Sequence, residues 1–159
     1  MTKNCYQLAQ IWVPWILVMI TSFIYPIGSK AGEVIYFRPP GWVFGIAWFI
    51  LLLLFGFSWA YTTDVIEYKI GVHVCYTFVV IFLIAWIVMK NKQAQEKYLI
   101  WILFITFMLC LFCYTLVKKC SKLMLVPLIT WILFAIWMSV AEIIRIYPNK
   151  LPSQLNNFK

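Results

Sequence analysis

The side chains that could carry chemistry are few in this sequence and widely scattered. The 159 residues include five acidic residues and one histidine, His73. A Ser/His/Asp set or a pair of carboxylates within one segment cannot be assembled from these groups, and a metal site with several histidines is excluded. We therefore predict no catalytic residues, no metal ligands and no covalently bound cofactor. A binding or transport role ranks above an enzyme.

Two cysteines, Cys110 and Cys113, have the Cys-x-x-Cys spacing of redox and metal sites. They lie within an apolar run, and the βαβ pattern that accompanies a redox motif is absent from the sequence. Buried cysteine behaves as a small apolar residue. Packing is therefore the favoured interpretation, and a redox or metal role is the alternative.

Glu142 is an ionisable residue near the end of an apolar segment, where such residues by default suggest function. The favoured alternative is an ion pair with Arg145, three residues later on the same helix. Trp131, Ala135 and Ser139 precede Glu142 at a spacing of four, so they share one helix face. A large residue followed by two small ones leaves a hollow beside the indole ring.

The elements that position these residues are predicted to be membrane helices. The chain is 65% hydrophobic and 11% charged, whereas soluble domains carry about 25% charge. Five apolar segments are long enough to span a bilayer as helices. They are expected at residues 8–27, 41–61, 70–89, 98–117 and 123–147. The sequence thus predicts an all-α integral membrane protein, with five transmembrane helices in a single bundle and one domain over residues 1–159.

The net charge of +8 does not indicate a nucleic-acid partner. The basic residues cluster in short stretches between apolar segments, where membrane topology and anionic lipid headgroups account for them. Of the 13 lysines and arginines, eight flank the side of the C-terminus and five the other side. This bias predicts a cytoplasmic C-terminus. The first apolar segment is too long for a signal-peptide core and has no convincing cleavage site, so we expect it to remain as a span.

The start of the second segment is the most distinctive stretch of the chain. Pro39 and Pro40 exclude a helix interior there, so a membrane helix is expected to begin near Gly41. Further along, Gly56 and Ala60 form a small-xxx-small face suited to close helix packing. The chain has nine tryptophans. The deeper ones either line a cavity for a flat aromatic or sterol-like ligand or face lipid, and composition favours neither.

Three motifs occur in order along the chain and together resemble one known family. They are Trp12-x-Pro14, then Pro39-Pro40-x-Trp42-x-Phe44-x-x-x-Trp48-x-x-Leu51, then Pro127-x-x-x-Trp131-x-x-Phe134-Ala135. The chain is similar to the translocator protein / tryptophan-rich sensory protein (TspO/MBR) family, also called the peripheral benzodiazepine receptor. The resemblance covers the first, second and fifth apolar segments, and the remaining two match only as apolar spans.

The resemblance implies a membrane translocator or receptor with a role in tetrapyrrole or lipid transport and in stress signalling. Its ligands would be porphyrin, haem or a sterol-like molecule, bound in a pocket between the helices. The protein would be a homodimer in contact with membrane lipids. Either the bacterial plasma membrane or the mitochondrial outer membrane fits. The pocket residues carried over from the family are Trp48, Leu52, Cys75, Phe78, Phe82, Trp131, Ala135, Met138 and Ser139.

The sequence departs from the family pattern in three places. Leu52 stands where the family has tyrosine, which removes a pocket hydroxyl. The first loop, at residues 28–38, covers the pocket in the family, and the family's aromatic and proline-rich run is shortened here to Tyr36-Phe37-Arg38-Pro39-Pro40. The proposed cholesterol motif lacks its Leu or Val before Tyr147 and Lys150, so cholesterol binding through it is not expected.

Two other functions stay open at this point. Some bacterial members of the family are proposed to degrade porphyrin in light, which would use the same pocket, with its tryptophans as radical partners. A signalling or scaffold protein would instead depend on a partner surface. Illumination of bound protoporphyrin tests the first alternative, and saturable ligand binding by purified protein counts against the second.

Overall fold

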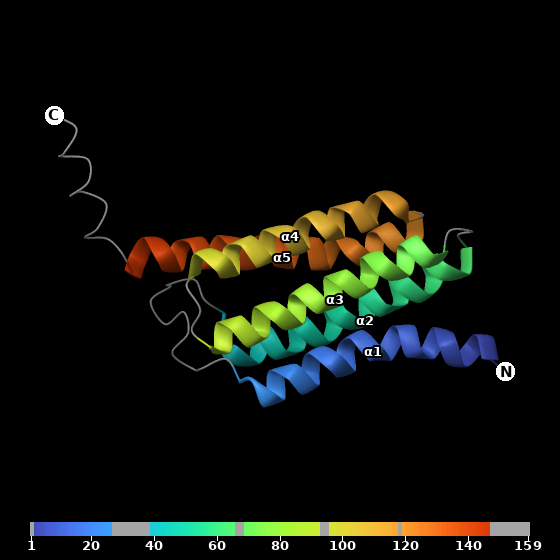
Figure 1. Ribbon diagram of the computed structural model, residues 1–159, viewed down its shortest axis with the longest axis horizontal. Helices are drawn as coiled ribbons and strands as arrows, with labels where there is room; N and C mark the ends of the chain where they lie inside the picture. The colour runs from blue at the N-terminus through green and yellow to red at the C-terminus, as the bar shows by residue number, and fades with distance from the viewer. Residues whose placement is uncertain (1, 27–38, 66–68, 93–95, 118, 147–159) are drawn as a thin grey trace.

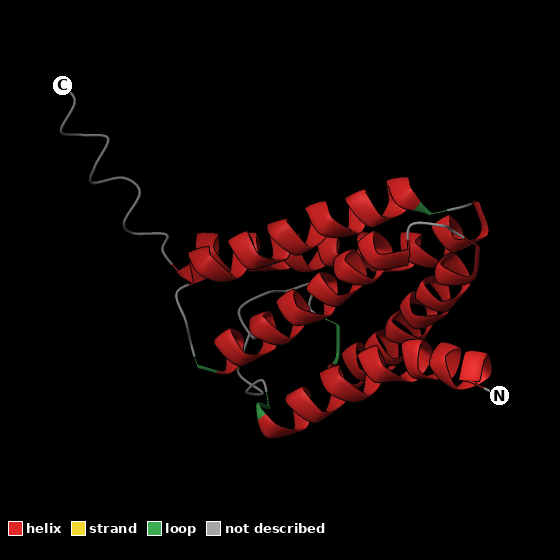
Figure 2. Ribbon diagram, turned by 45° about the vertical axis from the view of Figure 1, so that its right-hand side comes forward, coloured by secondary structure: helices red, strands yellow, loops and turns green. Residues whose placement is uncertain are grey.

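The computed structural model describes residues 2–26, 39–65, 69–92, 96–117 and 119–146 (Figure 1). Each of these ranges contains one α-helix (Figure 2). The helices are α1 (Thr2–Ile24), α2 (Gly41–Val65), α3 (Lys69–Asn91), α4 (Glu96–Leu116) and α5 (Lys119–Ile146). All five are long and apolar enough to cross a membrane. The predicted all-α fold with five spanning helices is therefore confirmed.

The helices lie side by side along one long axis, and consecutive helices run in opposite directions (Figure 1). Helix α2 is central, because it packs against α1, α3 and α5. Helix α4 completes the bundle by packing between α3 and α5. Among the described residues, no Cα atom of α3 comes within 8 Å of a Cα atom of α5. Any direct contact between these two helices must therefore be made by long side chains.

Three helices extend beyond the apolar segments predicted for them. Helix α1 begins at Thr2 rather than at residue 8, α2 continues to Val65 rather than residue 61, and α5 begins at Lys119 rather than residue 123. The prediction placed each of these three helix bounds at the border between polar and apolar residues. In α2 and α5 the helix continues past that border, where buried hydroxyls such as those of Thr62, Thr63 and Ser121 bond to partners inside the bundle.

The other helix ends differ less from the prediction. Helix α1 ends at Ile24 rather than residue 27, because Pro26 disfavours helical conformation at the residue before it. The ends of α3 and α4 lie within two residues of the predicted bounds. The first loop at residues 28–38, as well as Tyr147 and Lys150 of the incomplete cholesterol motif, lie outside the described residues.

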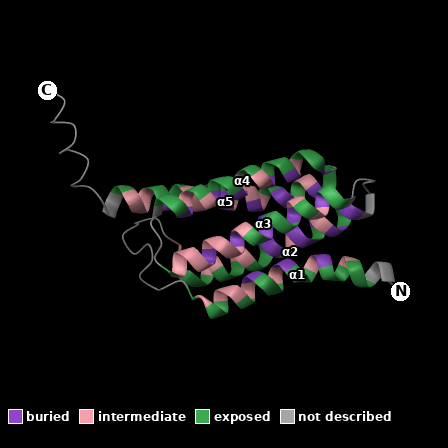
Figure 3. Ribbon diagram, viewed as in Figure 1, coloured by how far each residue is buried: buried purple, intermediate pink, exposed green. Residues whose placement is uncertain are grey.

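Helices α1 and α2 approach each other closely at Gly56. A Cβ atom added there would clash with the carbonyl oxygen of Ile11 and lie 2.7 Å from its Cα. Of the predicted small-residue face, Gly56 thus lies at a close helix contact, and Ala60 is buried. Buried side chains line the inner faces of the helices, while large apolar side chains such as Phe23 and Trp101 remain exposed on the outside (Figure 3). This distribution suits a lipid environment.

Candidate ligand-binding site

A cavity of about 320 Å³ lies inside one end of the bundle. Four helices build it: the C-terminal halves of α1, α3 and α5 and the N-terminal half of α2. Its lining residues are Val18, Met19, Ser22, Gly41, Phe44, Gly45, Trp48, Trp86, Ile87, Lys90, Ala135, Met138, Ser139 and Glu142. Most of these are apolar, and the few polar groups come from α1, α3 and α5. A mostly apolar cavity with a few polar groups is typical of small-molecule sites.

The residues of α2 and α5 leave this space open because several are small. Gly41 and Gly45 have no protein atom within 4 Å of the position that a Cβ would take. On α5, which packs against α2, Ala135 and Ser139 are one helical turn apart and contribute small side chains to the lining. The larger ring of Trp48 on α2 also lines the cavity. A flat ligand would therefore have a ring to stack against and small side chains elsewhere in the wall.

Four of the nine predicted pocket residues line this cavity, namely Trp48, Ala135, Met138 and Ser139. Trp131 is not among the lining residues, but it supports them from behind. Its ring meets that of Phe44 edge-on, with centroids 5.5 Å apart, and that of Trp48 at 6.4 Å. These contacts fix the orientation of the Trp48 ring that the cavity exposes.

The other four predicted residues lie elsewhere. Leu52 is fully buried in the core, and Cys75 lies beside Cys113 of α4. Phe78 is 47% exposed on the outside of the bundle, and Phe82 is partly buried but does not line the cavity. The structure thus places no predicted residue of α3 at the cavity, which is instead lined by three others from that helix.

The reason is the rotation of successive turns around α3. Residues four apart are offset by about 40° on a helix of 3.6 residues per turn. Phe78, Phe82, Trp86 and Lys90 form such a row, which turns from the lipid-facing side toward the interior by the last two members. The available sequence signal was a tryptophan followed by a lysine one turn later, at the end of an apolar segment.

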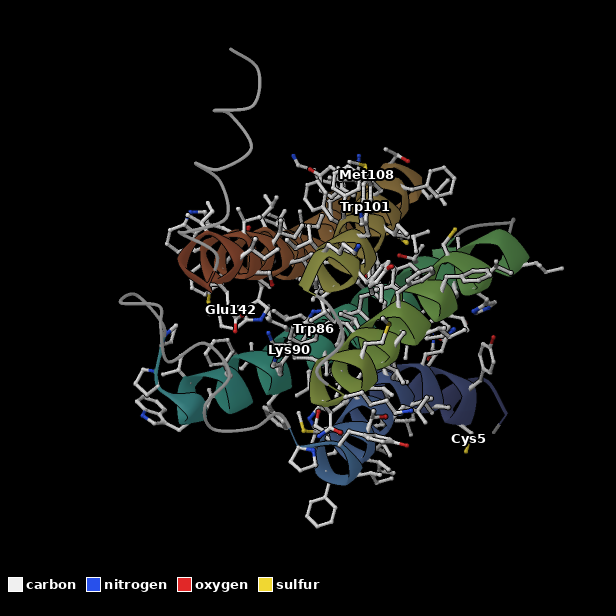
Figure 4. The ribbon with its side chains drawn as sticks, turned by 60° about the vertical axis from the view of Figure 1, so that its left-hand side comes forward. Cys5, Trp86, Lys90, Trp101, Met108 and Glu142 are labelled. Atoms are coloured by element: carbon white, nitrogen blue, oxygen red, sulfur yellow. The ribbon has the colours of Figure 1, made fainter. Side chains whose placement is uncertain are left out.

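Lys90 and Glu142 form an ion pair at the cavity, with Nζ 2.9 Å from Oε2. Their side chains are only 11% and 13% exposed. The sequence had paired Glu142 with Arg145 on its own helix, whereas the structure gives it a partner on α3; the side chain of Arg145 lies outside the described residues. Figure 4 shows Lys90 and Trp86 pointing from α3 toward Glu142 on α5.

The Trp86 indole adds a polar group without a partner. Its Nε1 atom is buried and has no hydrogen-bond acceptor among the described residues. A buried N–H left unpaired costs about 1–3 kcal/mol. Trp86 lines the cavity, so its indole N–H is a donor in the cavity wall for which the described residues supply no acceptor. Trp15 also has an unpaired indole N–H, but Trp15 does not line the cavity.

The opposite end of the bundle contains a hydrogen-bonded cluster around His73. Trp59 Nε1 donates to His73 Nδ1 at 2.8 Å, and Tyr6 Oη lies 2.8 Å from His73 Nε2. An indole nitrogen can only donate, so His73 must be neutral with its proton on Nε2. The bond to Tyr6 is then donated by His73. Nearby, Thr63 Oγ1 donates a hydrogen bond to Gln10 Oε1 at 3.1 Å, which extends the cluster.

A second set of hydroxyls joins α2, α3 and α5 at the same end. Ser58 Oγ donates to the carbonyl of Ser121 at 3.2 Å, and Tyr76 Oη lies 2.8 Å from Ser58 Oγ. Since the Ser58 proton is already used, Tyr76 is the donor in the second bond. Thr62 Oγ1 donates to Ser121 Oγ at 3.0 Å. These groups satisfy one another, so this end has internal partners where the cavity end has space.

Comparison with known families gives the geometry its context. A sequence profile described as the TspO/MBR family matches residues 33–144. The chain belongs to the TspO/MBR family. The matched segment contains all cavity-lining residues of α2, α3 and α5, while those of α1 precede it. A search of curated proteins finds no match to the chain. The molecule is therefore a multi-pass membrane protein of the TspO/MBR family with a cavity at one end of its five-helix bundle.

Proposed function

We propose that this TspO/MBR protein binds tetrapyrroles and other flat hydrophobic ligands in the cavity between α1, α2, α3 and α5. The observation that carries the proposal is a mostly apolar cavity lined both by the Trp48 ring and by the small residues Ala135 and Ser139. A flat ring stacked on an aromatic side chain gains about 0.5–1.5 kcal/mol beyond the burial of its apolar area.

The proposed role follows from binding inside a membrane. A protein that takes up such ligands between its helices is suited to tetrapyrrole or lipid transport and to signalling their abundance under stress. We propose that the protein acts as a homodimer, with its C-terminus on the cytoplasmic side of a bacterial plasma membrane or a mitochondrial outer membrane. We propose that ligands enter at the end of the bundle where α1 ends and α2 begins, because the cavity lies at that end.

The test is a titration of purified protein in detergent with protoporphyrin, haem and a sterol, followed by quenching of tryptophan fluorescence. In the variant Trp131→Ala with Ala135→Phe, one change removes support for Trp48 and the other fills the cavity. We expect protoporphyrin affinity to fall about tenfold or more, the equivalent of at least one aromatic contact.

Leu133→Phe is the matched control, because Leu133 lies on the same helix but is 47% exposed on the outside. It adds the same aromatic ring without entering the cavity and should leave affinity unchanged. If the cavity variant binds protoporphyrin as tightly as the unmodified protein, the ligand does not occupy this cavity.

A further inference from the structure

The Lys90–Glu142 ion pair connects two helices whose backbones do not pack together. In the described ranges, Cα atoms of α3 and α5 are all more than 8 Å apart, yet the two side chains meet at 2.9 Å. Both residues line the cavity. In Figure 4 they extend toward each other across the space between these helices. The pair is therefore part of the cavity wall and is held there by charge rather than by helix packing.

Trp86 and Lys90 place two hydrogen-bond donors on one face of α3. They are four residues apart, so their side chains lie one above the other. Lysine offers up to three protons and no acceptor, and the indole offers one proton. The Trp86 N–H is thus the donor on this face for which the described residues provide no acceptor.

A carboxylate is the group that best matches these donors. Its two oxygens accept several hydrogen bonds, and a charge-assisted bond to lysine is stronger than a neutral one. A lysine that is 11% exposed needs a counterion, and the Glu142 carboxylate lies in that position. An acidic ligand could take over that role, accept the Trp86 proton as well, and release Glu142.

We propose that Lys90 and Trp86 form a carboxylate-binding subsite, in which Glu142 is a resident counterion that competes with the ligand. The ligand class is then a flat apolar molecule with a peripheral carboxylate, its ring against Trp48 and its acid group at Lys90. This inference rests on the proposed function and sharpens it, because a neutral flat molecule would use only the apolar part of the cavity.

The experiment compares protoporphyrin with its dimethyl ester, which has the same ring without the acid groups. Affinities are measured in detergent, and each variant is compared with the unmodified protein for each probe, so that the partition of the probes into micelles cancels. Glu142→Gln removes the competitor, and we expect it to bind the acid about tenfold more tightly and the ester unchanged.

The double variant Lys90→Met with Glu142→Gln removes both charges and leaves neither one buried alone. Relative to Glu142→Gln, we expect it to lose at least about tenfold in affinity for the acid and nothing for the ester. Trp86→Phe keeps a ring but not the N–H, and should weaken only the acid, by about three- to tenfold. Lys92→Met is the matched control, since Lys92 is exposed in the turn after α3, and it should change neither affinity.

A ratio of acid to ester affinity that is the same in all these variants overturns the subsite. That outcome differs from failure of the proposed function, in which neither probe binds the unmodified protein saturably. A fatty acid shares the carboxylate but not the ring. If oleate displaces protoporphyrin at equal concentration, the ring part of the proposal is wrong and the acid group belongs to an acyl chain.

Discussion

The two ends of the helix bundle differ in whether their polar side chains have hydrogen-bond partners within the protein. At the end with the start of α1 and α3, polar side chains of His73, Trp59, Ser58 and Tyr76 all find partners within the protein. At the other end, the same helices leave a cavity of about 320 Å³ with an unpaired indole N–H at Trp86. We call the hydrogen-bonded end around His73 and Ser58 the closed end, and the end with the cavity the open end.

The difference between the two ends concerns how polar groups are paired inside a membrane helix bundle. Polar groups inside a membrane are costly unless they are paired. At the closed end they are paired internally, which joins α1, α2, α3 and α5 firmly. At the open end, the link between α3 and α5 that the described residues show is the Lys90–Glu142 ion pair. We therefore expect changes at the closed end to affect stability, and changes at the open end to affect binding, with the ion pair as the exception.

The largest effect is expected for Lys90→Met alone. It leaves the Glu142 carboxylate buried without its partner, which costs about 3–5 kcal/mol in free energy of unfolding. Adding Glu142→Gln should recover most of that loss. Unfolding in mixed micelles with increasing denaturing detergent, followed by circular dichroism, measures both. If the single and double variants are equally stable, the pair does not stabilise the open end.

Gly56→Ala comes next, at the contact of α1 and α2 toward the closed end. The added methyl group would clash with backbone atoms of Ile11, which cannot rotate away as a side chain would. We expect a loss of about 1–3 kcal/mol, as for other overpacked sites. Gly71→Ala is the control, because nothing lies within 4 Å of its added Cβ. Equal melting temperatures for the two variants would contradict the close approach.

His73→Phe tests the hydrogen bonds of the closed end. It keeps an aromatic ring but deprives the Trp59 indole of its acceptor, which should cost about 1–3 kcal/mol. Tyr6→Phe removes only the bond on the exposed side of the ring and should cost less. Protoporphyrin affinity should be unchanged in both variants. A large loss of affinity would mean that the two ends are coupled rather than separate.

The smallest effect on stability is expected for Gly45→Ala in the cavity wall. Its added methyl group meets no protein atom within 4 Å, so thermal stability should change by less than about 0.5 kcal/mol. The methyl group does occupy cavity space, and protoporphyrin affinity should therefore fall measurably in the fluorescence titration. A variant that changes stability but not binding would reverse the contrast between the two ends.

Hydropathy predicted the number of helices and most of their bounds, because a bilayer requires long uninterrupted apolar segments. It failed where polar residues begin, as at Thr62 and Ser121. Their hydroxyls are paired inside the bundle, and a pairing between distant segments leaves no mark on local hydropathy. Helical periodicity placed Trp131, Ala135 and Ser139 on one face of α5, whereas Trp48 and Met138 were assigned to the same pocket by the family resemblance.

The sequence alone therefore determined the membrane fold and, through the family resemblance, the cavity residues Trp48 of α2 and Ala135, Met138 and Ser139 of α5. Only the tertiary structure decided which face of α3 meets the cavity, and that face brought Trp86 and Lys90 to it. It also decided that Glu142 pairs across the cavity with Lys90. The physical reason is that periodicity fixes which residues share a face, while the rotation of each helix against its neighbours depends on packing across the whole bundle.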